Sequence, residues 1–424
     1  MKTLFTSDNR LYYLDWLRVL AFSILLFEHC AELFVPWNFW VKNAEVSSGL
    51  GYFITFLKPW RMPLLFMVSG AAVFLACKRK SSMEVLKERS IRILLPLVGA
   101  MFLVIPPQIY FIRIQEGYQG NFWEFYWSVF DFSWFPQGNL HWLHLWYLGF
   151  IFGFTLLVIP FLPKMRNEKV NRFLNRLDIG LKHPLLLITL GLLMSLPYYF
   201  INTTITKGNL AQLAFYFPYF LFGLTVFLRA HIQENVKQHA KAYLIFSICT
   251  TGALYALSFL RYDGVLLVKQ AVNDQHKPFG IFALQTLNTW LNVLAILGYA
   301  VKFLNFKSRK LTYANEAVYP FYVLHQTVIV AIGYYIVQMD TALPWKLLLV
   351  TFLSFGSIWV FYESVIKKFK LFRLLFGLKS KVKQEPVPAN DLLVTSELAT
   401  QNTPLNLEEV HPLLPDIKPN EMTI

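Results

Sequence analysis

The sequence contains few charged residues and few cysteines. Only 15% of its 424 residues are Asp, Glu, Lys or Arg, whereas 56% are hydrophobic. Apolar windows of about 20 residues recur along the chain, more often than in the core of a soluble protein. The three cysteines, Cys30, Cys77 and Cys249, lie in or beside apolar runs without paired spacing, which argues against a disulfide framework or a zinc site. The composition therefore predicts an integral membrane protein.

Several chemical motifs are also missing. The chain has no G-x-x-x-x-G-K-[ST] phosphate loop, no H-E-x-x-H zinc pair and no G-x-S-x-G nucleophile turn. ATP-driven and hydrolytic functions therefore lack their usual support, and we expect no metal and no tightly bound cofactor. No cleavable signal peptide is evident, because Arg10, Asp15 and Arg18 interrupt the start of the chain. We expect the first apolar segment to remain in the mature protein.

The apolar windows predict an all-α, polytopic protein of about ten transmembrane helices. They fall at residues 11–34, 50–77, 93–112, 143–162, 184–201, 210–228, 243–260, 279–304, 315–337 and 345–366. The net charge is +14, but lysine and arginine concentrate in alternate connections, such as those around residues 78–92 and 164–182. This distribution indicates topology rather than a nucleic-acid partner, and it places both termini in the cytoplasm.

The sequence predicts three regions of different character. Residues 1–366 form the transmembrane domain. Residues 367–383 interleave leucine and phenylalanine with cations, as in an amphipathic helix on an anionic inner leaflet. Residues 384–424 are polar, acidic and proline-containing, which predicts a disordered cytoplasmic tail.

The first apolar segment carries ionisable residues at membrane depth. Arg18 and His29 are eleven residues apart, about three helical turns, so they share a face roughly 16 Å apart along the axis. Asp15 falls on that face, and Glu32 lies one turn beyond His29. A charged group in a bilayer helix costs on the order of 2.5–3.5 kcal/mol, so such groups usually face a protein interior or a watery cavity. We therefore expect this helix to form one wall of a polar site.

His29 is the strongest candidate for catalysis. An imidazole titrates near neutral pH and can take the proton of a hydroxyl that attacks a carbonyl, and Glu32 is placed to orient the ring. A packed, hydrogen-bonded structural histidine is the alternative. The same two interpretations hold for His325, which lies in the apolar run YPFYVLHQ.

Two further groups of cations have alternative interpretations. Arg89 and Arg92 are three residues apart before the third span, where they either clamp a phosphate or only mark the cytoplasmic side. Lys58 and Arg61 lie within the second span, beside Pro59 and Pro63. The prolines predict a break in that helix, and the cations line either a cavity or the outer interface.

The connection at residues 113–142 is rich in tryptophan. Trp123, Trp127, Trp134 and Trp142 lie among glycine and proline residues. Such aromatic residues form either a girdle at the membrane interface or a surface on which sugars stack.

These segments together resemble the acyltransferase 3 family of membrane proteins and, within it, a glucan-biosynthesis branch. The family has a basic residue, ten intervening residues and a histidine in its first helix, matched here by Arg18 and His29 in LDWLRVLAFSILLFEH. Its R-x-x-R pair is matched by Arg89 and Arg92. FMVSG at residues 66–70, LWYL at 145–148 and YPFYVLHQ at 319–326 follow in the expected order, so the resemblance covers residues 10–366.

The resemblance implies an O-acyltransferase in a cell inner membrane. Such an enzyme moves an acyl group, here acetyl or succinyl, from cytoplasmic acyl-CoA to a hydroxyl of a glycan or related acceptor on the outer side. Partners are then acyl-CoA, a carbohydrate acceptor and membrane lipids, while a homo-oligomer stays open. The residues expected to form the site are catalytic His29, Arg18, Asp15 and Glu32, donor-binding Arg89 and Arg92, and substrate-binding His325, Trp142, Trp146 and Arg61.

A transporter or a glycan or lipid flippase is the alternative from another class, because intramembrane charges also form substrate paths. We find no internal repeat and no inverted pair of broken helices of the kind that marks many transporters. A non-enzymatic membrane scaffold would leave the alignment of Asp15, Arg18 and His29 without an explanation.

Overall fold

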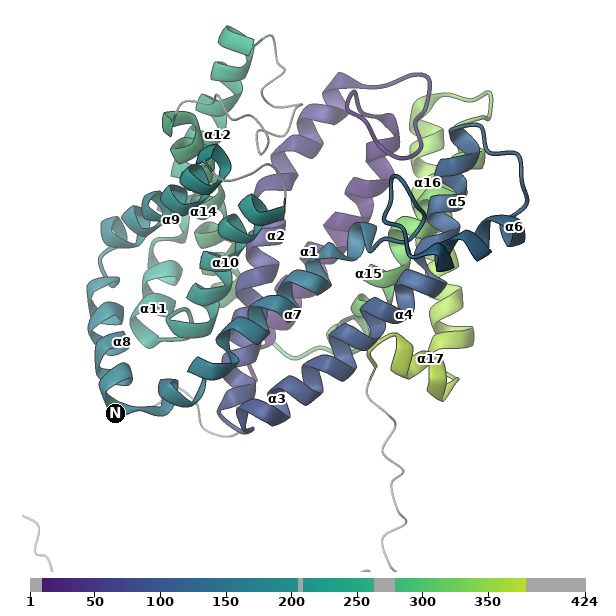
Figure 1. Cartoon of the computed structure of the whole chain (residues 1–424). Helices are drawn as coiled ribbons and strands as arrows, with labels where there is room; N and C mark the ends of the chain where they lie inside the picture. Colours follow the sequence, from purple (N-terminus) through teal and green to yellow (C-terminus); the bar gives the residue numbers. More distant parts are fainter. Residues whose placement is uncertain (1–9, 205–208, 263–278, 379–424) are drawn as a thin grey trace, which may run out of the picture. The chain divides into compact units, whose positions relative to one another are not determined.

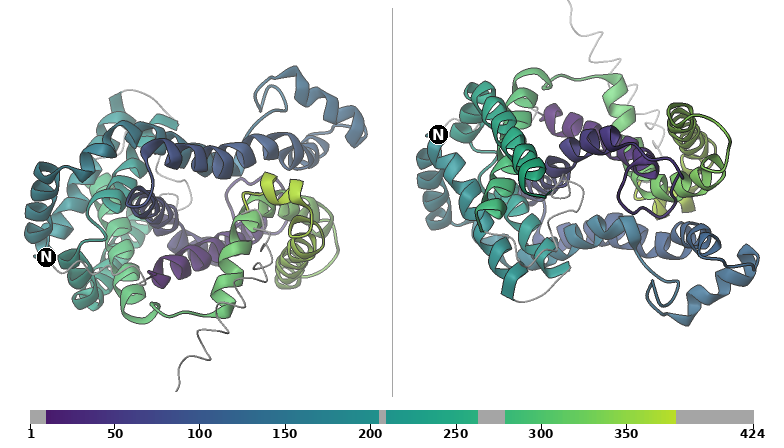
Figure 2. Two further views of the ribbon diagram at one scale, coloured as in Figure 1. Left: turned by 90° about the horizontal axis from the view of Figure 1, so that it is seen from below. Right: turned by 90° about the horizontal axis from the view of Figure 1, so that it is seen from above.

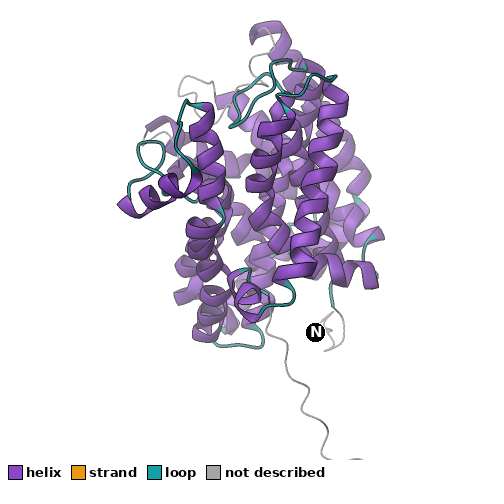
Figure 3. Cartoon of the chain, turned by 90° about the vertical axis from the view of Figure 1, so that its right-hand side faces the viewer, coloured by secondary structure: helices purple, strands orange, loops and turns teal. Residues whose placement is uncertain are grey.

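The computed structural model describes residues 10–204, 209–262 and 279–378, and every regular element among them is a helix (Figure 3). In this part of the chain, eight helices are long and apolar enough to cross a membrane, or up to nine if the bent pair α10 and α11 is one span. The all-α, polytopic class is therefore confirmed. The number of ten spans and the cytoplasmic location of both termini stay predictions.

The first half of the described chain contains the helices that carry most of the expected site. These are α1 (Tyr12–Ala31), the 3₁₀ turn η1 (Glu32–Phe34), α2 (Ser48–Cys77), α3 (Ser82–Arg89), the π turn η2 (Ser90–Leu94), α4 (Leu95–Leu103), α5 (Ile105–Gln115), α6 (Phe122–Trp127), α7 (Trp146–Val158) and α8 (Glu168–Gly180). The second half surrounds them. It contains α9 (Pro184–Thr204), α10 (Asn209–Thr225), α11 (Ala230–Gln238), α12 (Ala240–Tyr262), α14 (Phe279–Phe303), α15 (Arg309–Ile336), α16 (Leu343–Phe361), the π turn η8 (Tyr362–Ile366) and α17 (Lys370–Leu375).

Helix α1 lies among other helices, with α2 and α15 as its main neighbours and further contacts to α14 and α16. Figures 1 and 2 show α1 and α2 between a group formed by α9 to α14 and a second group that contains α5, α15 and α16. Asp15 and Glu28, which share α1 with Arg18, are buried. This location explains why a helix with these charges is stable, since its polar groups face protein rather than lipid.

Helix α2 is continuous over 30 residues although it contains Pro59 and Pro63. The predicted break is therefore wrong. A proline removes one backbone hydrogen bond, but neighbouring helices can hold a membrane helix together through such a site, and α2 packs extensively along α10. As a result Lys58 and Arg61 stay on one helix, one turn apart.

The contact between α2 and α10 depends on two glycines. A Cβ atom at Gly70 would lie 2.0 Å from the carbonyl oxygen of Phe220, and a Cβ atom at Gly223 would lie 2.0 Å from that of Met67. Small residues permit such a close approach of two backbones in membrane proteins. Gly70, the last residue of the FMVSG segment, therefore has a packing role.

Beyond α16 the structure describes part of the expected amphipathic segment. Phe369, Leu371 and Leu374 are exposed around α17, whereas Phe376 and Leu378 are buried against the rest of the chain. The location of this segment on a membrane surface stays a prediction. The expected tail, residues 384–424, lies outside the described residues.

We predict that Gly70→Ala destabilises the protein by about 1–3 kcal/mol, because the added methyl group overpacks the contact with α10. Thermal unfolding in detergent measures the effect. Gly153→Ala in α7 is the control, since a Cβ there has no atom within 4 Å. Equal stability of the two variants would contradict the close contact between α2 and α10.

Candidate functional site

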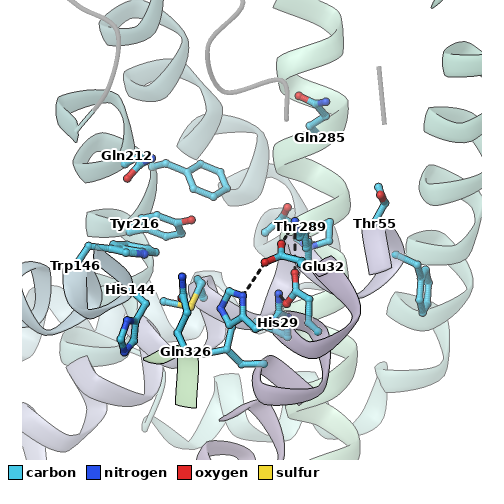
Figure 4. A pocket seen from close by; sticks show the side chains of 18 of the residues that line it. His29, Glu32, Thr55, His144, Trp146, Gln212, Tyr216, Gln285, Thr289 and Gln326 are labelled. Carbon is cyan, nitrogen blue, oxygen red and sulfur yellow. Dashed lines mark hydrogen bonds and ion pairs between the residues drawn. The ribbon is translucent and has the colours of Figure 1, made fainter. Parts of the chain in front are cut away.

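A cavity of about 560 Å³ lies beside the end of α1 (Figure 4). Its lining comes from α1, η1, α2, α9, α10, α12, α14, α15 and the residues that lead into α7. Six of the predicted site residues line it, namely His29, Glu32, Arg61, Trp142, Trp146 and His325. Asp15, Arg18, Arg89 and Arg92 are not among its lining residues.

His29 and Glu32 form a pair at the end of α1. The Nδ1 atom of His29 lies 2.7 Å from Oε2 of Glu32, and Figure 4 shows this contact at the cavity. A neutral imidazole that donates its Nδ1 proton to the carboxylate keeps a lone pair on Nε2. The pair thus has the arrangement of a general base with an orienting carboxylate, because the turn from α1 into η1 puts the two side chains together.

Two carboxylates from this turn meet two cations from α2. The Nζ atom of Lys58 lies 2.6 Å from Oε1 of Glu32 and 3.7 Å from Oε1 of Glu28. Arg61 forms an ion pair with Glu28, and these two residues are only 3% and 1% exposed. The continuous helix α2 puts both cations on the cavity side, which agrees with one of the two interpretations of the sequence. The partnership of Glu28 was not predicted, although its position one turn before Glu32 was a signal for it.

His325 and His144 are buried next to His29. The ring centroids of His29 and His325 are 5.2 Å apart, and those of His325 and His144 are 4.9 Å apart. Nδ1 of His325 donates to the carbonyl of Tyr322 at 2.5 Å, and Nε2 of His144 donates to that of Val323 at 3.0 Å. Each ring has a second, buried nitrogen without a hydrogen-bond partner among the described residues. His325 therefore has the main-chain hydrogen bond expected of a structural histidine, and it also borders the cavity.

Sequence reasoning missed His144. The available signal was its position three residues after His141, directly before the LWYL segment. His141 also lines the cavity, and its Nδ1 accepts a hydrogen bond of 2.8 Å from the main chain of Leu143. Burial lowers the pKa of the His141 imidazole, which favours the neutral form of this ring.

Helices α10, α12 and α14 line the cavity with uncharged residues. Gln212 and Gln285 lie across the cavity from His29 in Figure 4, on α10 and α14. The other polar residues that α12 and α14 contribute to the lining are Thr251, Tyr255, Thr286, Asn288 and Thr289. The only Asp, Glu, Lys or Arg residues in the described lining are the four in the ion pairs beside His29. Amide and hydroxyl groups together with Trp142, Trp146 and Tyr216 suit a ligand that offers both hydroxyl groups and apolar faces.

Asp15 and Arg18 lie about three turns from His29 along α1. Arg18 donates to the side-chain oxygen of Asn315 at 3.1 Å, and its Nη1 is 3.7 Å from Oδ1 of Asp15. Asp15 is also paired with Arg10, at 2.7 Å. The structure thus separates these two residues from the cavity that contains His29.

Arg89 ends α3, and Arg92 lies in the π turn η2. Such turns inside helices are frequent at functional sites. The Arg89 guanidinium interacts electrostatically with Arg18 of α1 and with Tyr147 of α7, and Arg92 lies 3.4 Å from Glu88. Arg18 and Arg89, from distant parts of the chain, therefore interact electrostatically at this end of α1, where Asp15 and Glu88 are the carboxylates near them.

The tryptophans of the connection at residues 113–142 divide between two locations. Trp123 and Trp127 on α6 are 69% and 68% exposed. Trp142 instead lines the cavity, where its ring contacts Trp134 at 5.8 Å between centroids. Only the end of this connection is thus placed where a cavity ligand can stack on it.

The chain is similar to a known protein family over most of its length. The family model described as "Acyltransferase domain" matches residues 11–363. Glucans biosynthesis protein C of Escherichia coli O157:H7 (strain EC4115 / EHEC) is 23% identical over 391 residues, which cover 89% of this chain and 97% of that protein. The protein of the same name from Escherichia coli (strain K12 / DH10B) matches with the same identity and coverage. No solved structure matches the chain.

Proposed function

This chain belongs to the acyltransferase 3 family and is a membrane acyltransferase, and from that premise we propose that it acylates a glycan hydroxyl. The donor in this proposal is cytoplasmic acyl-CoA, which carries an acetyl or succinyl group. The acceptor is a glycan or a related hydroxyl compound on the outer side of the membrane. Family membership favours this chemistry over the transporter or flippase alternative.

The observation that carries the proposal is the pair of His29 and Glu32 at the cavity. Nε2 of His29 takes the proton of the acceptor hydroxyl while the hydroxyl oxygen bonds to the thioester carbon. The bond between that carbon and sulfur then breaks, and the proton passes from His29 to the departing thiolate, which leaves as free CoA. A positioned base of this kind contributes about 10²- to 10⁴-fold to the rate. Transfer is direct in this scheme, without an acyl-enzyme.

The donor end of the proposal uses Arg18, Arg89 and Arg92. Acyl-CoA combines a phosphate-rich nucleotide with a narrow pantetheine arm, so it needs cations at one end and a path to His29 at the other. Guanidinium groups give directed, charge-assisted hydrogen bonds to phosphates. The electrostatic interaction of Arg18 with Arg89 supports a nucleotide site at the end of α1 that is remote from His29. Asp15 holds Arg18 in this arrangement.

The acceptor end uses the uncharged side of the cavity. Sugars present hydroxyl groups at their rims and apolar C–H groups on their faces, which match amide side chains and aromatic rings. Trp142, Trp146 and Tyr216 supply rings, while Gln212 and Gln285 supply amides. This lining supports a neutral acceptor, with His325 and Arg61 beside the reacting groups.

The cellular setting completes the proposal. Several apolar helices and the family show a multi-pass membrane protein. We propose the inner membrane of the cell, with membrane lipids around the helices and with the basic segment at residues 367–383 on the cytoplasmic side. A homo-oligomer is compatible with this arrangement.

We predict that His29→Ala abolishes acyl transfer while the protein remains folded and still binds acyl-CoA. His29→Gln should be nearly inactive, because an amide does not accept a proton near neutral pH. The assay is release of free CoA in the presence of a glycan acceptor, and His183→Ala is the control, since His183 is exposed and outside the cavity lining. Retention of more than about a tenth of wild-type turnover in either His29 variant would contradict the base role, given the usual size of that contribution.

We also predict that Arg89→Ala and Arg92→Ala weaken CoA binding. Each lost hydrogen bond from a charged group costs about 1.5–3 kcal/mol, so Kd should rise at least tenfold for each variant. Equilibrium binding of CoA to the purified protein measures this effect. Arg172→Ala and Arg176→Ala in α8 are controls that remove the same charge from exposed positions. If a folded Arg89→Ala/Arg92→Ala variant binds CoA as tightly as the controls do, these arginines act only as topology signals.

A further inference from the structure

The carboxylate of Glu32 is shared between two basic groups. One oxygen, Oε2, lies 2.7 Å from Nδ1 of His29, and the other, Oε1, lies 2.6 Å from Nζ of Lys58. Glu32 is buried, with 7% of its surface exposed. Each oxygen thus has its own partner, and Lys58 contacts the carboxylate on the side away from the imidazole.

A buried carboxylate beside a histidine creates a difficulty for base catalysis. In a poorly solvated site the unpaired negative charge favours the imidazolium form of its neighbour. An imidazolium has no lone pair on Nε2 and cannot accept a proton. A cation beside Glu32 opposes this effect and leaves more of His29 in the neutral form that can act as a base.

We propose that Lys58 is a positioning residue that keeps the His29 imidazole neutral by compensating the charge of Glu32. The inference rests on the proposed base role of His29 and deepens it. Lys58 transfers no proton in this scheme. It acts through Glu32, so that the resting site has a neutral imidazole and the proton that His29 gains from the acceptor is readily passed to the departing thiolate.

With a neutral His29 ring, the four paired side chains beside it balance in charge. Glu28 pairs with Arg61, and Glu32 pairs with Lys58. The other titratable groups that face this cluster are His325 of α15, His144 before α7 and Lys42 of the connection between η1 and α2. Lys42 donates to the main-chain carbonyls of Glu32 and Val35, and burial lowers its pKa to about 8. Lys58 is thus the cation that contacts the Glu32 carboxylate itself.

The surroundings of Lys58 fix its ammonium group. Nζ lies 4.5 Å from the centre of the Trp37 ring and 3.7 Å from Oε1 of Glu28, in addition to its short contact with Glu32. A cation over an aromatic face is attracted by the ring. Three groups from three segments of the chain therefore hold this charge in one place, which a compensating charge requires.

The test is a comparison of Lys58→Met with Lys58→Arg by turnover across a range of pH. We expect Lys58→Met to lose roughly ten- to a hundredfold near neutral pH, the size of effect that one nearby charge has on a protonation equilibrium. The loss should shrink as the pH rises, because the imidazole then loses its proton even without Lys58. Lys58→Arg should keep most of the activity, and the exposed Lys241→Met should match the wild type.

A second variant separates charge compensation from packing. In Glu32→Gln/Lys58→Met, the amide oxygen of glutamine still accepts the Nδ1 proton of His29, but no charge needs compensation. We expect this double variant to be more active near neutral pH than Lys58→Met alone. A pH-independent loss in Lys58→Met, with a double variant no better than the single one, would overturn the proposal.

The outcomes also distinguish this inference from the proposed function. If His29→Ala is inactive while Lys58→Met keeps wild-type turnover at neutral pH, the base role stands and the role of Lys58 falls. If His29→Ala keeps its turnover, the proposed function itself fails, whatever the Lys58 variants do.

Discussion

The pairing of two carboxylates at the end of α1 with two cations of α2 is the interaction on which the site depends. Glu28 and Glu32 would be costly to bury alone in a membrane protein, and so would Lys58 and Arg61. Paired, they remain beside the cavity and hold His29 in a defined orientation. This requirement explains why α1 lies among other helices, and why α2 must keep both cations on the same side.

Helix packing away from His29 keeps these paired side chains in place. The close contact of α2 with α10, made by Gly70 and Gly223, supports a helix that continues through two prolines. Helices α10 and α14 then close the far side of the cavity with uncharged residues. At the other end of α1, Arg18 interacts electrostatically with Arg89 of α3. In the proposed function, one helix thus connects a basic region for the donor with the uncharged part of the cavity for the acceptor.

Much of this arrangement could be predicted from local patterns. Apolar windows predict the helical class, and helical spacing predicts that Glu32 is adjacent to His29, since both depend on residues close in the sequence. The break at Pro59 and Pro63 was predicted wrongly, because the packing of α10 that supports α2 is invisible in the local sequence. His144, Gln212 and Gln285 were missed for the same reason, as their meeting with His29 depends on how distant helices pack. The number of spans was predicted from apolarity, a criterion that α1 itself does not satisfy, because it contains Asp15, Arg18 and Glu28.

The most direct test of the account is transfer across a sealed membrane. The purified protein is reconstituted in liposomes with labelled acyl-CoA enclosed inside and a neutral glycan only outside, and the external glycan is examined for the label by mass spectrometry. The account predicts acylated glycan outside, formed by the wild type and not by liposomes that contain the His29→Ala protein. Product that forms only when donor and acceptor share the same side of an intact membrane would contradict it.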